Sequence, residues 1–205
     1  MHFDFSALPS QTVYKLLTST VTPRPIAWVT TVSDEGCVNA APFSFFNVMG
    51  HQPPTVAIGL MRRANGELKD TSANIIENGE FVVNLVAESM MQQMNQTCAD
   101  YPPGVDELAK AGLTALPAAH VRPPLIQGSP VSLECVSQAT IVTGPHQVVV
   151  IGRVLGAHVD DAFVQDAERG YVKTAEMGLV ARMHGSGWYA RSTDLFQLAR
   201  PTVAD

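Results

Sequence analysis

The chain has 205 residues, of which 46% are hydrophobic and 16% charged, a length that suits one domain needing neither disulfides nor a metal to fold. Its formal net charge of −6 disfavours general nucleic-acid binding, which requires a basic footprint. Three scattered cysteines match no disulfide framework or zinc-site spacing and favour a reducing cytoplasm. With no basic region before an apolar run, and no run of 18 apolar residues, we expect neither a secretion signal nor a membrane span.

The first half of the chain predicts one helix followed by strands. Residues 10–17 have helical periodicity, and Ser10 is a candidate cap. Strands are expected at 26–32, 37–49 and 55–61, because these segments are rich in β-branched and aromatic residues. Pro42 cannot donate a ladder hydrogen bond, so we expect a bulge or a sheet edge near it.

The second half alternates short helices with strands and ends in a long hairpin. Helices are expected at 71–78, 88–98 and 105–111, and strands at 81–86, 131–142 and 147–159. Gly144, Pro145 and His146 form the turn of the hairpin. Strands at short intervals favour an antiparallel barrel or sandwich and disfavour a doubly wound parallel sheet. The sequence has neither the dinucleotide fingerprint nor the P-loop motif.

The segment from Lys69 to Asn74 opens a predicted helix and is the strongest candidate site. The first N–H groups of a helix have no internal partner, and the helix dipole is positive there. Lys69 and the hydroxyls of Thr71 and Ser72 add donors, which together favour a phosphate cradle. The simpler alternative is ordinary capping by Asp70 or Thr71 beside a solvated lysine.

Two earlier segments are further candidates. Around Pro42, alternation places Ser44 among phenylalanines, and small residues allow a flat ligand to approach the backbone. The alternative is a core strand with an incidental serine. Arg24 stands between two prolines that restrict its direction, and Thr30 and Thr31 point to opposite faces of the following strand. A surface salt bridge is the alternative for Arg24.

The histidines offer little independent chemistry. None of the six has the spacing of a metal site, so we expect no metal. His146, at a turn, and His184, in a glycine-rich loop, are the two catalytic candidates, although loop histidines are more often surface or capping residues. No serine or cysteine nucleophile motif is present to favour hydrolysis.

Taken in order, these segments resemble the flavin reductase-like family, which includes the flavoredoxin-like FMN-binding split barrels. The resemblance extends over most of the chain from about residue 20. The matching segments are Arg24–Thr31, Val38–Asn47, Pro53–Pro54, Lys69–Thr71, Asn74–Ile75, Gly79–Asn84, Gly104–Asp106, Gly112–Leu113, Gly144–His146, Ile151–Val154, Arg182, Tyr189 and Arg200–Pro201.

The resemblance implies a six-stranded antiparallel Greek-key split β-barrel with a few peripheral helices. One domain would span 1–205, with a helical extension over 1–20 and a segment over 160–205 that completes the barrel and the flavin site. The family usually forms homodimers with FMN near the interface. Carried over by position, Ser44, Lys69 and Thr71 would hold the phosphate and ribityl chain, and Asp70 and Asn74 would order the helix. The residues expected to line the flavin are Arg24, Pro25, Thr30 or Thr31, Asn39, Ala40, Ala41, Pro42, Phe43 and Arg182.

The function implied is an NAD(P)H-dependent flavin reductase that transfers hydride from NADH or NADPH to FMN, with a monooxygenase or electron-transfer protein as partner. Two alternatives stay open: an electron carrier with tightly held FMN, and an FMN-dependent enzyme acting on a small organic substrate. His184 stands where the family commonly has glycine. Its side chain would either narrow the substrate face or offer a proton donor.

Overall fold

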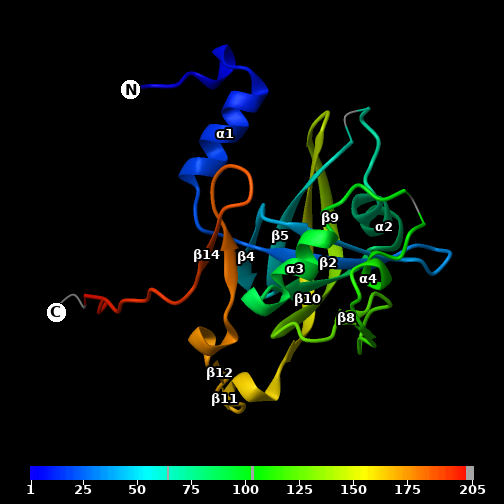
Figure 1. The fold of residues 1–205 in the computed structure, drawn as a ribbon, viewed down its shortest axis with the longest axis vertical. Coiled ribbons are helices and arrows are strands. Elements are labelled where there is room, and N and C mark those ends of the chain that lie inside the picture. Colours follow the sequence, from blue (N-terminus) through cyan, green and yellow to red (C-terminus); the bar gives the residue numbers. More distant parts are fainter. Residues whose placement is uncertain (64, 103, 202–205) are drawn as a thin grey trace.

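A computed structural model describes residues 1–63, 65–102 and 104–201, and the fold is built on one large antiparallel sheet (Figure 1). Within these residues its strand order is β3-β2-β6-β9-β10-β5-β4. The bounds are β2 (Ala27–Val32), β3 (Val38–Phe43), β4 (Phe46–His51), β5 (Pro54–Met61), β6 (Glu80–Leu85), β9 (Val131–Gly144) and β10 (Gln147–Val159).

Smaller elements surround this sheet. The short strands are β1 (Arg24–Pro25), β13 (Val180–Arg182) and β14 (Tyr189–Arg191) in one sheet, β7 (Ala115–Leu116) with β8 (Leu125–Ile126), and β11 (Val164–Asp166) with β12 (Tyr171–Val172). The helices are α1 (Ser10–Thr20), α2 (Asp70–Asn78), α3 (Met91–Gln96) and α4 (Glu107–Lys110), with 3-10 turns at Phe5–Ala7, Glu88–Met90, Asp161–Phe163 and Thr174–Met177.

The sheet curls because its two outermost strands are consecutive in the chain. Only Ser44 and Phe45 separate β3 from β4, which lie at opposite edges of the strand order. The Phe45 carbonyl accepts a hydrogen bond from the Gly59 amide at 2.7 Å. The predicted sheet edge at Pro42 is therefore confirmed, whereas the single strand expected at 37–49 is two strands. This break gives the sheet seven strands in the described residues, where six were expected.

Two apolar cores hold the sheet. The larger one fills its concave face with side chains such as Val29, Ile58 and Phe81, which are fully buried. The second packs Trp28 and Met94 between the outer face and the helices. The predicted helix at 88–98 is instead a 3-10 turn followed by α3. The Thr97 hydroxyl donates to the Met94 carbonyl and accepts from the Trp28 indole, which joins the end of α3 to β2.

The other predicted helices and the long hairpin are present in the structure, with bounds that differ from the predicted ones by a few residues. α2 is confirmed, and Gly79 ends it with a φ of 73°. α1 continues to Thr20 and follows Pro9, so Ser10 is not its cap. α4 is shorter than predicted because Asp106 caps it by accepting from the Ala109 amide. Among the described residues, no helix is long and apolar enough to cross a bilayer.

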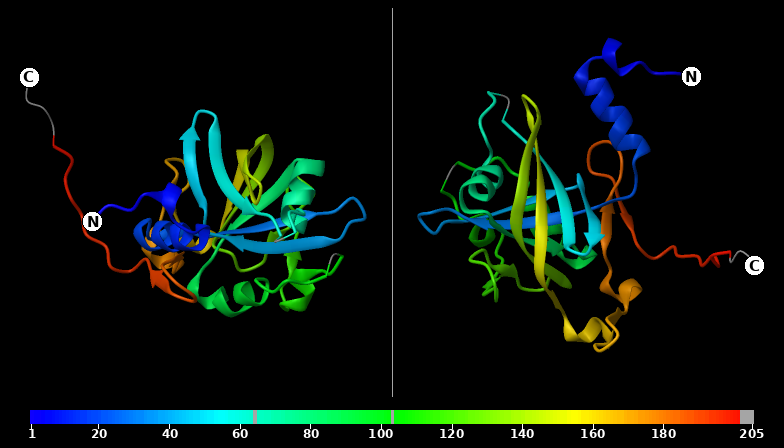
Figure 2. Two further views of the ribbon diagram at one scale, coloured as in Figure 1. Left: turned by 90° about the horizontal axis from the view of Figure 1, so that it is seen from above. Right: turned by 180° about the vertical axis from the view of Figure 1, so that it is seen from behind.

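The terminal segments extend away from the sheet. In the right view of Figure 2, α1 projects from one side of the molecule, and in both views the C-terminal tail leaves as an extended chain. Large apolar side chains on these segments are exposed, including Tyr14 at 49% and Phe196 at 92%. The ends of the chain therefore present apolar surface that the rest of the chain does not cover.

Candidate functional site

The N-terminus of α2 opens into a pocket without a side-chain cap. Lys69 occupies the cap position, and its carbonyl accepts from the Ala73 amide at 2.9 Å. The alternative of ordinary capping required the side chain of Asp70 or Thr71 to cap α2. In this described stretch neither side chain does so. The first-turn amides before Ala73 consequently lack intrahelical partners and lie at the positive end of the helix dipole.

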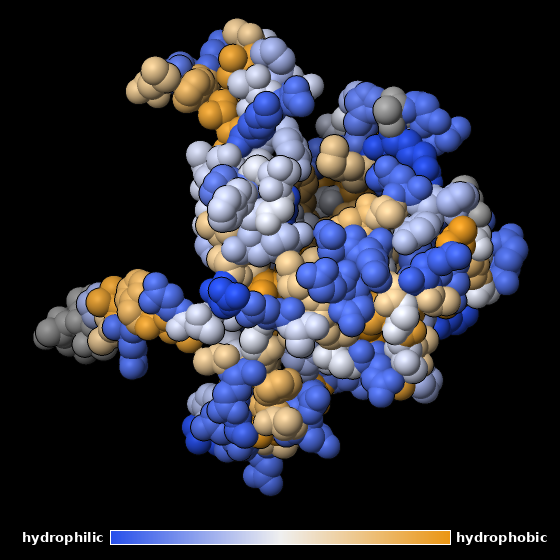
Figure 3. Space-filling model, in the orientation of Figure 1, coloured by the Kyte–Doolittle hydropathy of each residue, from blue (hydrophilic) through white to orange (hydrophobic). Residues whose placement is uncertain are grey.

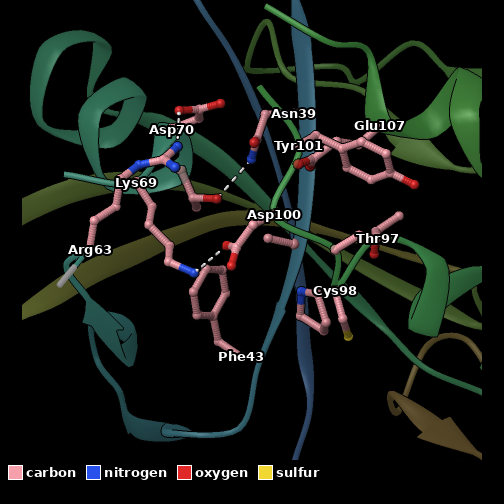
Figure 4. A pocket seen from close by; sticks show the side chains of 14 residues that line it. Asn39, Phe43, Arg63, Lys69, Asp70, Thr97, Cys98, Asp100, Tyr101 and Glu107 are labelled. Carbon is pink, nitrogen blue, oxygen red and sulfur yellow. Dashed lines mark hydrogen bonds and ion pairs between the residues drawn. The ribbon is translucent and has the colours of Figure 1, made fainter. Parts of the chain in front are cut away.

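The pocket gathers seven of the residues predicted from the sequence and seven that were not (Figure 4). The predicted residues are Asn39, Ala41, Pro42, Phe43, Lys69, Asp70 and Thr71. The additional ones are Arg63, Thr97, Cys98, Ala99, Asp100, Tyr101 and Glu107. The volume is about 150 Å³, below the ~300–1,000 Å³ typical of whole-ligand sites, so this pocket alone suits only one end of a cofactor.

Two basic side chains make the pocket receptive to an anion. Lys69 Nζ lies 2.9 Å from Asp100 Oδ1, and Arg63 Nη2 lies 3.4 Å from Asp70 Oδ1. The hydrogen bond from Lys69 lowers the pKa of Asp100. All four side chains are 30% or more exposed, and ion pairs this exposed are worth ~1 kcal/mol or less. A phosphate group can therefore displace either carboxylate at little cost.

A buried polar network supports the pocket from β3. Asn39 and Thr71 are 6% and 2% exposed, and the Asn39 amide lies 2.7 Å from Thr71 Oγ1. Glu107, 8% exposed, accepts from the Ala40 amide at 2.7 Å. Burial raises the pKa of Glu107 to about 7, although the Ala40 hydrogen bond opposes that shift. Glu107 was missed from the sequence because a single glutamate after a helix cap has no distinguishing pattern.

Two further depressions adjoin the first and share Pro42 with it. One, of about 220 Å³, is lined by Ser44 and Lys69 together with Tyr14 of α1. The other, of about 300 Å³, is lined by Ser44 and Arg182. The combined surface reaches cofactor dimensions and brings two more predicted residues, Ser44 and Arg182, to the same site.

Arg24 connects the end of α1 to the C-terminal segment. It is 7% exposed, and its guanidinium donates to the carbonyls of Thr18, Val21 and Met183 at 2.6–2.7 Å. Its Nε also lies 3.5 Å from Ser44 Oγ. The residue thus fixes the end of α1 against the main body, while Arg24 and Pro25 line a separate groove beside Ser44.

Four further predicted residues, Thr30, Thr31, Ala40 and Asn74, line neither the pocket beside α2 nor the two adjoining depressions. Thr30, Thr31 and Ala40 are fully buried. Thr30 Oγ1 donates to the Pro124 carbonyl, and Thr31 Oγ1 accepts from Asn74 Nδ2 at 2.9 Å. The Asn74 side chain thereby joins α2 to β2.

The two candidate histidines also lie outside the pocket. His146 is exposed at the β9–β10 turn, where its carbonyl accepts from the Arg62 amide. His184 stacks on Trp188 with ring centroids 6.0 Å apart and an interplanar angle of 11°. Arg182 donates to the Gly185 and Trp188 carbonyls and so shapes the loop that carries both rings. The described residues contain no cluster of three or more metal-ligating side chains.

Comparison with known proteins gives consistent matches over nearly the whole chain. The family model for the flavin reductase like domain matches residues 19–175. An uncharacterised protein of Deinococcus radiodurans is 42% identical, covering 99% of this chain and 91% of its own. The structure of nitrilotriacetate monooxygenase component B from Bacillus cereus has a TM-score of 0.91 and 34% identity, covering 97% of this chain and 98% of its own. Pseudomonas fluorescens 2-nitrobenzoate 2-nitroreductase has a TM-score of 0.90 and 32% identity, covering 100% and 98%.

Proposed function

The chain belongs to the flavin reductase-like family, and on that premise we propose that it binds FMN and catalyses flavin reduction by NADH or NADPH in the cytoplasm. The observation that carries the proposal is the uncapped N-terminus of α2, which opens into a pocket lined by Lys69 and Arg63. Such a helix terminus with basic neighbours is a favourable phosphate site. The free state of the three cysteines fits a reducing compartment.

The donor set fits a flavin nucleotide. Lys69, Arg63 and the first-turn amides of α2 would hold the phosphate, with Thr71 beneath it. Ser44, in the adjoining depressions, would contact the ribityl chain. The flat part of the cofactor would lie along Pro42 and Phe43, where β3 forms the sheet edge. An edge strand has unpaired backbone groups that can hydrogen-bond a ring bearing several donors and acceptors.

When bound, FMN supplies the hydride-accepting chemistry, and the protein provides position and electrostatics. Pro42 and Phe43 exclude water from one face of the site. Arg182 donates to the Gly185 and Trp188 carbonyls and so shapes the loop beside the depression that it lines with Ser44. Hydride transfer needs alignment more than an acid, so the absence of histidines from the described pocket lining is compatible with this reaction.

The decisive assay is oxidation of NADH and NADPH by purified protein with and without added FMN. We expect FMN-dependent oxidation with at least one nucleotide, and reduced flavin then becomes available to a monooxygenase or an electron-transfer partner. No oxidation of either nucleotide, by protein shown to bind FMN, would exclude the reductase and favour an electron carrier.

We further propose a homodimer. Exposed apolar side chains occur on α1, on β4 and on the tail, including Leu17, Met49 and Phe196. Figure 3 shows orange surface along the N-terminal segment and the tail. Burial of such side chains is worth ~25 cal/mol per Å², which favours association. Light scattering should give twice the 22.0 kDa chain mass, and a monomer at micromolar concentration would contradict the proposal.

One observation favours a second candidate, an FMN-dependent enzyme acting on a small planar substrate. The stacked His184 and Trp188 flank Ser186 and Gly187, which line the depression beside Arg182. Trp188 is 63% exposed and presents an aromatic face to solvent. In this case Trp188→Ala would raise the KM for an aromatic substrate while leaving the affinity for FMN unchanged. Equal effects on the substrate KM and on the affinity for FMN would exclude Trp188 as a stacking surface for the substrate.

A further inference from the structure

Arg24 is a buried cation that the proposed reaction does not use. It is 7% exposed, and none of the ion pairs among the described residues includes it. Backbone carbonyls surround the guanidinium instead: Nη1 donates to Thr18 and Val21, and Nη2 donates to Met183. Because a guanidinium is a rigid planar fork of donors, it can hold groups from separate segments in one fixed geometry.

The helix α1 depends on this arginine for its position. Among the residues of α1, all of which the structure describes, Thr18 alone is buried, so the packing of the helix contributes little to holding it. The last carbonyls of a helix have no intrahelical partner and lie at the negative end of its dipole, where the guanidinium meets them. One turn before Thr18, Tyr14 contacts Phe45 with ring centroids 6.2 Å apart and lines the depression of about 220 Å³.

The same guanidinium anchors the 183–188 loop. Nη2 of Arg24 donates to the Met183 carbonyl at 2.7 Å, and the Met183 amide donates to the Trp188 carbonyl at 2.9 Å, which closes the base of the loop. Ser186 and Gly187 of this loop line the depression of about 300 Å³. Figure 1 shows the loop before β14 beside the end of α1, where Arg24 holds both segments.

Ser44 lies where the two depressions meet. It lines both of them, and its Oγ lies 3.5 Å from Arg24 Nε, at the outer limit of a hydrogen bond. Arg24 itself lines neither depression. Its effect on a ligand beside Ser44 is therefore exerted through α1 and the 183–188 loop, which form the walls on either side.

We propose that Arg24 is a positioning residue for the flavin ring, which holds α1 on one side of Ser44 and the 183–188 loop on the other and so sets the spacing of the two walls. The inference rests on the proposed function, because FMN is the ligand. Its signature differs from that of the phosphate donors. Loss of Lys69 or Thr71 should weaken FMN binding alone, whereas loss of Arg24 should weaken FMN and riboflavin equally, since both carry the ring.

The test measures Kd values for FMN and riboflavin by fluorescence titration in wild type, Arg24→Lys and Arg24→Gln. Both variants should raise both Kd values by about tenfold, because lysine keeps the charge but lacks the planar fork that joins the two segments. Arg153→Gln is the matched control and should change neither value. Arg153 is an exposed arginine of β10 that lines neither the pocket nor the two depressions. Circular dichroism verifies that each variant folds.

Two further measurements separate positioning from a general effect on folding. Tyr14→Ala should raise the Kd for both flavins about threefold in wild type but little in Arg24→Lys, because Tyr14 is already displaced there. Time-resolved fluorescence anisotropy should show faster local motion of Trp188 in the Arg24 variants. The only other tryptophan, Trp28, is fully buried and gives a rigid reference signal.

The outcomes distinguish the positioning role from the proposed function. Unchanged riboflavin affinity in folded Arg24 variants would overturn the positioning role alone, and so would additive effects of Tyr14→Ala and Arg24→Lys or unchanged motion of Trp188. Where both Arg24 variants unfold, Tyr14→Ala decides, because unchanged Kd values for both flavins would show that α1 forms no wall of the site. Failure of wild type to bind either flavin would overturn the proposed function and the positioning role with it.

Discussion

Removing the phosphate donors of Lys69 and Thr71 together should weaken FMN binding far more than riboflavin binding. A hydrogen bond to a charged group contributes ~1.5–3 kcal/mol, and Lys69 must first leave Asp100, an exposed pair worth ~1 kcal/mol or less. The net contribution of Lys69 is then ~1–2 kcal/mol. The Thr71 hydroxyl adds ~0.5–1.5 kcal/mol. Lys69→Ala with Thr71→Ala should therefore raise the Kd for FMN by roughly 10- to 400-fold.

Flavin fluorescence titration measures this effect directly. Riboflavin shares the ring and ribityl chain but lacks the phosphate, so its Kd should change less than about threefold by the same reasoning. Lys110→Ala is the matched control, because Lys110 is an exposed lysine of α4 that does not line the pocket. A loss of equal size for FMN and riboflavin would refute the assignment of the α2 terminus to phosphate.

Three other perturbations test separate parts of the structure. Asp100→Asn removes the carboxylate that competes with phosphate for Lys69. Titration should show FMN binding tightened about two- to fivefold at low salt, with less gain at high salt. Unchanged affinity would mean that Asp100 does not compete with phosphate for Lys69. The pKa of Glu107 is raised to about 7 in the folded chain. The native state therefore binds more protons than the unfolded state between pH ~4.5 and 7. The free energy of unfolding should consequently fall by about 1–3 kcal/mol as pH rises through that window. Urea denaturation should show a smaller fall in Glu107→Gln, and an equal fall in both would contradict the assignment. Gly152→Ala places a methyl group against the Phe81 ring, whose Cε1 atom lies only 3.1 Å from the added carbon. The substitution should lower the free energy of unfolding by about 1–3 kcal/mol in the same assay. An unchanged unfolding midpoint would show that the Phe81 ring moves aside freely.

The elements set by local chemistry were predictable from sequence. α2 could be placed because Gly79 adopts the left-handed conformation that ends a helix, and the β9–β10 hairpin because its turn residues and alternation agree. The division of strand 37–49 was not predictable in detail. It depends on a change of partner at Ser44 and Phe45, because β3 pairs with β2 at one end of the strand order and β4 pairs with β5 at the other, and local propensity does not encode this change.

The candidate site shows the same division between local and long-range information. The helix start at Lys69 and Thr71 has a local pattern, and both residues line a pocket in the structure. Glu107 reaches the pocket only because α4 folds back against β3. This long-range contact lets the Glu107 carboxylate accept a hydrogen bond from the Ala40 amide. Arg24 could be singled out beside its prolines, but its carbonyl partners come from α1 and from the 183–188 loop.

The central proposal is that this chain binds FMN and reduces it with NADH or NADPH. The most direct test is an absorbance spectrum of the protein after incubation with FMN and desalting, followed by anaerobic addition of NADH or NADPH. We predict a retained flavin band that bleaches with at least one nucleotide. A protein that retains no flavin under these conditions, and takes none up in titration, would contradict the account, because the uncapped terminus of α2 would then bind no phosphate.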